Sequence, residues 1–159
     1  MKQFRYFFVA VLAVCLCCCD GCCDDDDDKG DFISLAVDIF KARLDFERDV
    51  NKMEPQILDT RSVEDYEAGH IPGAINIDAS DNRAWMDATS EFMTKLKATF
   101  QQGQKLYIYN NSGWSPIGMA LPGEISKIWG RENTIILECG FPGWKEAYPD
   151  SVVTGKEPR

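Results

Sequence analysis

The sequence predicts an α/β fold, in which helices cover both faces of a mainly parallel central sheet to give three layers. Four short apolar runs rich in β-branched and aromatic residues indicate strands, at residues 57–58, 74–77, Leu106–Tyr109 and Thr134–Leu137. Apolar residues recur at helical spacing in the longer segments between them. This alternation implies parallel strands, because each helix returns the chain to the same edge of the sheet.

A first amphipathic helix is predicted before the first of these strands. Its expected apolar face consists of Leu35, Ile39, Ala42 and Phe46. Pro55 then closes the connection into the strand at 57–58. A short helix is predicted at Val63–Ala68, with Ser62 as its N-cap and Gly69 at its end.

A longer helix is predicted between the strands at 74–77 and Leu106–Tyr109. Ser80 or Asp81 could cap it, and Gly103 would end it. Its apolar residues are Trp85, Phe92, Leu96 and Phe100. The last long helix is predicted to start at Pro116. Because Pro122 removes a helical hydrogen bond and Gly123 follows it, we expect that helix to be broken.

Residues 57–77 combine several short motifs. An Asp-x-Arg motif at Asp59 and Arg61 follows the strand, an acidic helix comes next, and His-Ile-Pro-Gly-Ala begins at His70. This run closely resembles the rhodanese (sulfurtransferase) family, and the resemblance covers roughly residues 32–150. It implies a rhodanese-like three-layer domain. Fold alone does not carry the activity, which depends on the residues at the site.

The loop after the strand Leu106–Tyr109 differs from the family at its key position. The family has Cys-x-x-Gly-x-x here, and Gly113 matches its glycine, so the resemblance places Asn110 where the nucleophilic cysteine would be. The loop residues are Asn110, Asn111, Ser112, Gly113, Trp114 and Ser115. A carboxamide is no nucleophile, and asparagine commonly shapes turns. The alternative role of this loop is a pocket for a small anion at the following helix N-terminus.

Cys139 is the only cysteine outside the N-terminal tract. Where the rhodanese family has a Gly-Gly-x-x-x-Trp turn, the resemblance places Cys139 at the first glycine, at the same edge of the sheet as Asn110. It is the candidate for a relocated nucleophile in a sulfurtransferase or redox-active enzyme. The alternative, which we favour, is an inert and partly buried cysteine at the strand end.

Three further residues of the motif receive structural roles. Asp59 and Arg61 suit an ion pair that joins the strand end to the acidic helix at residues 63–68, and His70 belongs to the turn. Related phosphatases need a Cys-x5-Arg loop, which this chain lacks, so phosphatase activity is disfavoured. The sequence predicts no metal site and no cofactor.

The N-terminus has the pattern of an export signal. Lys2 and Arg5 precede an apolar stretch of eleven residues at 6–16. That stretch is shorter than the ~20 residues of a membrane-spanning helix. Cysteines at its end resemble those of bacterial lipoproteins that are cut and acylated, and the candidates are Cys15, Cys17, Cys18 and Cys19. A soluble secreted or periplasmic protein, from which the whole tract is removed, is the alternative.

The sequence therefore divides into an export segment (1–19), a Cys/Asp-rich disordered tether (20–30), the domain (31–153) and a tail (154–159). Residues 31–159 carry twenty acidic and fourteen Lys or Arg residues, without a basic cluster, so nucleic-acid binding is unexpected. We expect a membrane contact through the lipid, a location in the cell envelope, and an unidentified protein or small anion as partner. The leading hypothesis is a binding or scaffold module without ordinary sulfurtransferase activity.

Overall fold

The computed structural model describes residues 31–80, 85–112 and 116–156. Within these residues, five parallel strands form one sheet in the order β1-β5-β4-β2-β3. The strands are β1 (Ile33–Leu35), β2 (Gln56–Asp59), β3 (Ala74–Asn76), β4 (Leu106–Tyr109) and β5 (Thr134–Leu137). The predicted export segment and tether lie outside the described residues.

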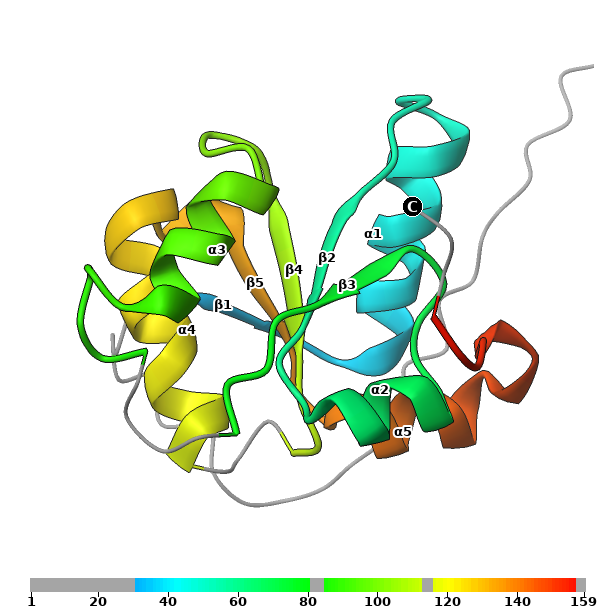
Figure 1. Cartoon of the computed structure of the whole chain (residues 1–159). Helices are drawn as coiled ribbons and strands as arrows, with labels where there is room; N and C mark the ends of the chain where they lie inside the picture. The colour runs from blue at the N-terminus through cyan, green and yellow to red at the C-terminus, as the bar shows by residue number, and fades with distance from the viewer. Residues whose placement is uncertain (1–30, 81–84, 113–115, 157–159) are drawn as a thin grey trace, which may run out of the picture.

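Helices cover both faces of the sheet, which confirms the predicted α/β class (Figure 1). The helices are α1 (Val37–Asp49), α2 (Val63–Ala68), α3 (Glu91–Thr99), α4 (Pro116–Trp129) and α5 (Gly140–Ala147). One core cluster packs α3 and α4 on the sheet around Leu58 and Ile108. The other packs α1, α2 and α5 around Ile57 and Tyr107. Neighbouring strand residues thus serve opposite faces, as the pleat of a strand requires.

The predicted apolar face of the first helix is wrong. Leu35 belongs to β1, which the sequence analysis missed and which pairs with β5 at the edge of the sheet. Phe40 and Leu44 are the fully buried residues of α1, whereas Ile39 and Phe46 are each 52 % exposed. Once β1 takes residues 33–35 into the sheet, α1 is turned so that the expected core stripe faces outward.

The helix predicted around residues 85–100 is shorter than expected. It begins only at Glu91, and Ser90 caps it by accepting a hydrogen bond of 3.2 Å from the Met93 N–H. The Asp87 carboxylate accepts bonds from both the backbone and the hydroxyl of Thr89. Such local side-chain bonds compete with helix formation, which explains the later start. The proposed cap Asp81 lies outside the described residues.

The break expected in the last long helix is absent, because α4 continues through Pro122. A proline inside a helix costs about 3 kcal/mol through its lost hydrogen bond and its steric clash. Leu121, Ile125 and Trp129 are almost completely buried against the sheet. Burying side chains of this size yields roughly 1.5–3 kcal/mol each, which outweighs the cost of the proline. Among the described helices, none is long and apolar enough to span a bilayer.

Candidate functional site

The carboxyl ends of β2, β4 and β5 meet at one edge of the sheet, where ligands bind in many α/β folds. Backbone hydrogen bonds join the segments that leave these strands. The Thr60 N–H donates to the Tyr109 carbonyl at 3.1 Å, and the Phe141 N–H donates to the Asn110 carbonyl at 2.7 Å. The structure therefore brings Asn110 and Cys139 to the same edge.

Gly140 is the point of closest approach between the two segments. Its φ of +64° lies in the left-handed region that favours glycine. A Cβ atom at this position would lie 2.7 Å from the Asn110 carbonyl oxygen and 2.9 Å from backbone atoms of Asn111 and Ser112. Only a residue without a side chain allows the loop after β4 to pack on the start of α5.

The Asn110 side chain shapes the loop from within. It is 7 % exposed, and its Oδ1 accepts a 2.9 Å hydrogen bond from the Ser112 N–H, as in an Asx turn. Asn111 ties the same loop to α2, because its Nδ2 donates to the Asp65 carboxylate at 2.9 Å. Gly113, Trp114 and Ser115 lie outside the described residues, so the anion pocket that they would complete remains a prediction.

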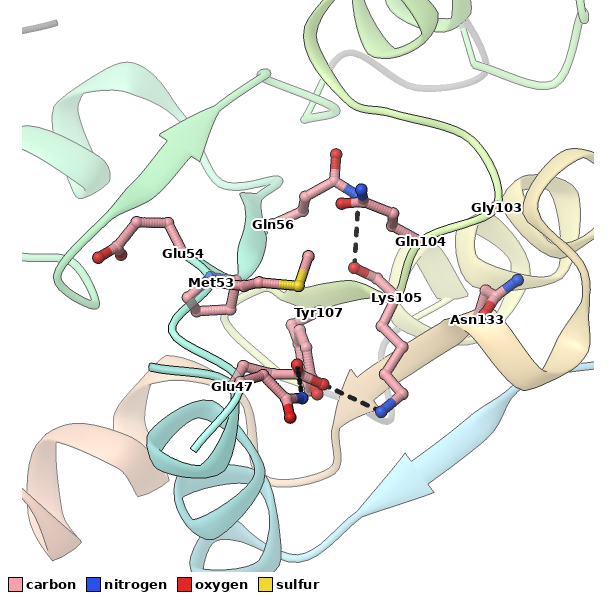
Figure 2. A pocket seen from close by; sticks show the side chains of 11 residues that line it. Glu47, Met53, Glu54, Gln56, Gly103, Gln104, Lys105, Tyr107 and Asn133 are labelled. Atoms are coloured by element: carbon pink, nitrogen blue, oxygen red, sulfur yellow. Dashed lines mark hydrogen bonds and ion pairs between the residues drawn. The ribbon is translucent and has the colours of Figure 1, made fainter. Parts of the chain in front are cut away.

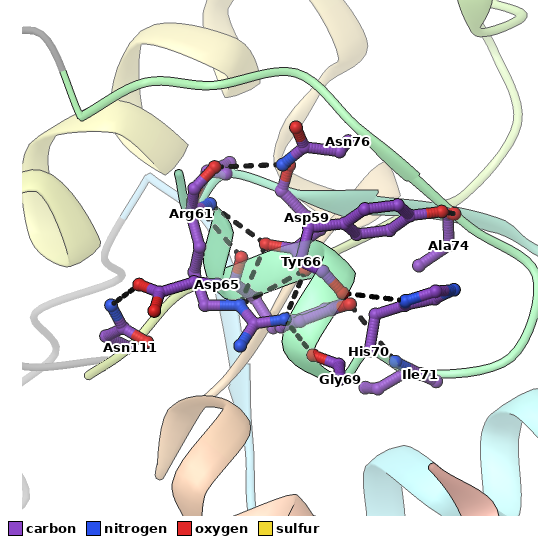
Figure 3. A network of polar contacts seen from close by, with 12 residues as sticks. Asp59, Arg61, Asp65, Tyr66, Gly69, His70, Ile71, Ala74, Asn76 and Asn111 are labelled. Carbon is purple, nitrogen blue, oxygen red and sulfur yellow. Dashed lines mark hydrogen bonds and ion pairs between the residues drawn. The ribbon is translucent and has the colours of Figure 1, made fainter. Parts of the chain in front are cut away.

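A buried ion pair lies beside this loop (Figure 3). The Arg61 Nε and Nη2 atoms donate to the Asp59 carboxylate at 3.0 and 2.6 Å, and both side chains are at most 3 % exposed. The guanidinium also lies 3.9 Å from the centroid of the Phe141 ring. Burial acts to lower the pKa of Arg61, but the hydrogen bonds and charge of Asp59 raise it overall. Arg61 is therefore a fixed cation inside the domain.

The connection from this pair to α2 differs from the expectation. Arg61 Nη2 donates to the Gly69 carbonyl at the end of α2, at 2.7 Å, rather than to the carboxylates of that helix. Those carboxylates have other partners, since Asp65 accepts from Asn111 and Glu67 pairs with Lys156. The bidentate bond to Asp59 turns the guanidinium inward, away from the solvent-facing acidic residues.

His70 lies in the interior of the domain. Its Nδ1 is 2.9 Å from the Tyr66 carbonyl oxygen, and its ring stacks on the Tyr66 ring at 3.8 Å. Its backbone pairs in both directions with Val153, at 2.9 and 3.0 Å. The His70 backbone therefore holds the C-terminal segment on the fold, and its side chain, which has no exposed surface, has no access to a substrate.

Cys139 is exposed, although part of its side chain packs against the following turn, and its expected inertness stays a prediction. It immediately precedes α5, and its sulfur fills the space beside Gly143, where a Cβ atom would come within 2.3 Å of it. Partial desolvation against this turn raises the pKa of the thiol, and the negative charge of Glu138 adds to the increase. The protonated thiol is a poor nucleophile, because the thiolate is the reactive form.

We expect Cys139 to be alkylated by iodoacetamide more slowly at pH 7 than an unfolded cysteine peptide of the same local sequence. Because its pKa is raised, the rate should increase with pH and reach its midpoint above that of the peptide. Mass spectrometry of the proteolytic fragment that contains Cys139 measures this rate separately from the other cysteines. A midpoint at or below that of the peptide would contradict the prediction.

Sequence reasoning missed the aromatic surroundings of Arg61. The rings of Tyr109 and Phe141 stack with their centroids 5.9 Å apart, and the Arg61 guanidinium lies 5.4 Å from the first centroid and 3.9 Å from the second. Side chains alternate between the two faces of the sheet along β4, so Tyr109 is expected on the same face as Tyr107. No local sequence pattern connects Tyr109 to Phe141. Within the described ranges, no group of three or more His, Cys, Asp or Glu side chains could hold a metal ion.

Comparison with known proteins agrees with this geometry. Residues 41–147 match the rhodanese-like domain family, and the chain therefore belongs to that family. A Saccharomyces cerevisiae homolog of single-domain rhodanese and of the Cdc25 phosphatase catalytic domain has a similar structure. That match has a TM-score of 0.57 and 18 % identity, and covers 79 % of this chain and 90 % of the yeast chain.

Two further solved structures share the fold. The rhodanese-like domain of an Anabaena protein matches with a TM-score of 0.55 and 17 % identity, over 79 % of this chain and 88 % of that one. Thiosulfate sulfurtransferase from Pseudomonas aeruginosa matches with a TM-score of 0.50 and 21 % identity, over 80 % of this chain. The matched region spans only 21 % of the sulfurtransferase chain. At these identities the likeness establishes the fold.

Proposed function

We propose that this rhodanese-like protein is exported, lipid-anchored and inactive as an ordinary sulfurtransferase, and that its domain acts as a binding or scaffold module at the cell envelope. The observation that carries the proposal is the position of Asn110. It follows β4, where family resemblance expects the nucleophile, and its carboxamide is used to form the turn.

The chemistry of sulfur transfer supports this proposal. A persulfide forms only on a thiolate, which attacks the sulfur donor and then passes the outer sulfur to an acceptor. Asn110 offers a neutral carboxamide that cannot form such a bond. The remaining charged pair at this edge, Asp59 and Arg61, is buried and mutually satisfied. These residues therefore stabilise the edge and supply no replacement nucleophile.

A sulfurtransferase or redox-active enzyme that uses Cys139 is the second candidate. The exposure of Cys139 favours it, together with the direct contact of the adjacent Gly140 with the loop after β4. The raised pKa of the thiol weighs against it. His70 is buried on Tyr66 and cannot serve as the activating base for this thiol.

Sulfur transfer is tested on residues 31–159, which include both core clusters. The reduced fragment is treated with thiosulfate, and intact mass is read together with cyanide-dependent turnover. We expect no added sulfur and no turnover, with the Pseudomonas thiosulfate sulfurtransferase as the active control. A gain of one sulfur atom with turnover, both lost in Cys139→Ser, would overturn the proposal and make Cys139 the nucleophile.

The lipid anchor is supported by the sequence of residues 1–19 and needs its own test. Cells that express the full chain are labelled with radioactive palmitate, and label on the protein is compared between membrane and soluble fractions. We expect labelled protein in membranes. Replacement by serine of Cys15, Cys17, Cys18 or Cys19, singly and together, should identify the acylated residue. Unlabelled protein that is wholly soluble would favour the secreted alternative.

A further inference from the structure

An apolar stripe runs along the outer face of α1, and we call it the outer stripe. It consists of Ile39, Ala42, Phe46, Val50 and Met53. All five are exposed, and none belongs to either core cluster. On its inner face the same helix buries Phe40 and Leu44 completely. A helix that is apolar on both faces is typically covered on both, so the outer stripe lacks the cover that its composition favours.

The spacing of the outer stripe suits contact with a second helix. Successive members lie 3, 4, 4 and 3 residues apart in the sequence. This repeat keeps apolar side chains on one line, and two such lines pack against each other in helix pairs. The Met53 N–H donates to the Glu47 carbonyl at 3.0 Å, which keeps the end of the stripe folded against α1.

The polar groups beside the outer stripe are bonded within the protein. A pocket of about 250 Å³ lies at the amino-terminal end of β2 and β4, and an apolar groove of about 460 Å³ adjoins it along α1. In the pocket, Glu47 pairs with Lys105 at 3.0 Å and accepts a 2.6 Å hydrogen bond from Asn51 (Figure 2). The part of this surface that lacks a partner is therefore the apolar stripe.

Two charged residues flank the outer stripe. Asp38 and Arg43 both line the groove, and both are exposed. Because a helix turns through about 100° per residue, they lie on opposite sides of Ile39. Asp38 accepts a 2.6 Å hydrogen bond from the Tyr148 hydroxyl, whereas Arg43 has no hydrogen bond or ion pair within the described residues. Arg43 is thus available to a carboxylate of another molecule.

These charges favour one arrangement of two copies. Across a parallel helix pair, positions on opposite sides of the stripe meet, so Asp38 of one copy faces Arg43 of the other. Two-fold symmetry forms this pair twice. An antiparallel pair would instead bring the two Arg43 side chains together, and like charges would oppose it. Parallel helices also enter the dimer from the same end, as two chains tethered to one membrane would.

We propose that the outer stripe is a homodimer interface, in which two copies of α1 pack in parallel and Asp38 of each copy pairs with Arg43 of the other. A second copy is the occupant because this surface itself supplies both the apolar line and both members of the charge pair. A single pair of helices gives a smaller interface than an obligate dimer has, so the association is weak and reversible. The proposal depends neither on the lipid anchor nor on the loss of sulfur chemistry.

The test is sedimentation equilibrium of residues 31–159, which hold every described helix and strand and both core clusters. The fragment is kept reduced, so that Cys139 cannot join two copies. We expect a monomer–dimer equilibrium that depends on concentration. Ile39→Gln and Phe46→Gln should each weaken it about tenfold or more, because two copies of the apolar side chain leave the interface.

Met119 provides the matched control for these variants. It is 46 % exposed, similar to Phe46, but lies on α4 at the other face of the sheet. Met119→Gln should dimerise like the unaltered fragment. A monomer at every concentration up to about 1 mM, or equal effects of Phe46→Gln and Met119→Gln, would overturn the proposal. If that monomer binds lipid vesicles and Phe46→Gln does not, a membrane surface is the occupant instead.

A charge exchange tests the parallel arrangement. Arg43→Asp places two carboxylates opposite each other and should weaken dimerisation roughly fivefold or more, because both exposed pairs are lost. Asp38→Arg combined with Arg43→Asp restores both pairs with the signs exchanged and should dimerise more tightly than either single variant. A double variant no tighter than the single ones would refute the pairing of Asp38 with Arg43.

Discussion

Replacement of Gly140 by alanine is expected to reduce the free energy of unfolding by about 3 kcal/mol or more. Two costs combine in this substitution. The left-handed backbone at φ +64° costs an ordinary residue about 1–2 kcal/mol. The new Cβ atom would also lie 2.7 Å from the Asn110 carbonyl oxygen, and crowding of this kind costs about 1–3 kcal/mol. Urea denaturation followed by tryptophan fluorescence measures the loss.

Gly103 provides the matched control, because its φ is +82° but no atom lies within 4 Å of the position that a Cβ would take. Gly103→Ala should therefore show only the backbone cost, about 1–2 kcal/mol. The difference between the two variants reports the contact between the start of α5 and the loop after β4. Equal losses would mean that the loop moves away at no cost and that the two segments do not constrain each other.

The second large effect is expected at the buried ion pair. Asp59→Ala leaves the Arg61 guanidinium without its bidentate partner in a site where its side chain is only 3 % exposed. Loss of one member of a buried pair typically costs 3–5 kcal/mol, because the remaining charge is desolvated and unpaired. The Gly69 carbonyl alone cannot compensate, since it is a neutral acceptor. Chemical denaturation of the variant measures this effect.

The surface pair of Glu91 and Lys95 is the comparison for this prediction. Its distance of 2.7 Å resembles that of the buried pair, but its side chains are 82 % and 61 % exposed. Glu91→Ala should reduce the free energy of unfolding far less than Asp59→Ala, because water screens both charges. A loss at Asp59 as small as the loss at Glu91 would show that Arg61 finds solvent or another partner when Asp59 is removed.

The sequence predicts those parts of the fold that are determined by short-range chemistry. The helix at Val63–Ala68 agrees with the structure because Ser62 caps it through the Asp65 N–H. Short-range chemistry could not predict which face of α1 is buried. Whether Phe40 or Ile39 is buried depends on β1, whose pairing with β5 joins residues about a hundred positions apart in the chain. Similarly, the continuity of α4 through Pro122 depends on packing that the local sequence does not contain.

The candidate site shows the same division. Placement of Asn110 and Cys139 at one edge follows from parallel strands, which end together. Two features depend on how particular side chains pack: the exposure of Cys139 and the hydrogen bond from Arg61 to the Gly69 carbonyl. Neither could be predicted from the spacing of residues in the sequence. The pocket at the amino-terminal end of β2 and β4 could not be predicted either, because residues of α1, β2 and the segments that precede β4 and β5 line it together.

The pairing of β1 with β5 also determines when the domain can form as the chain leaves the ribosome. The first strand has no neighbour until β5 has been made, because Ile33 pairs with Ile135. The pairing of His70 with Val153 likewise waits for residues close to the C-terminus. Contacts between such distant positions form late in folding, since a long loop must first close. The domain therefore stays incomplete on the ribosome until residue 153 has been synthesised.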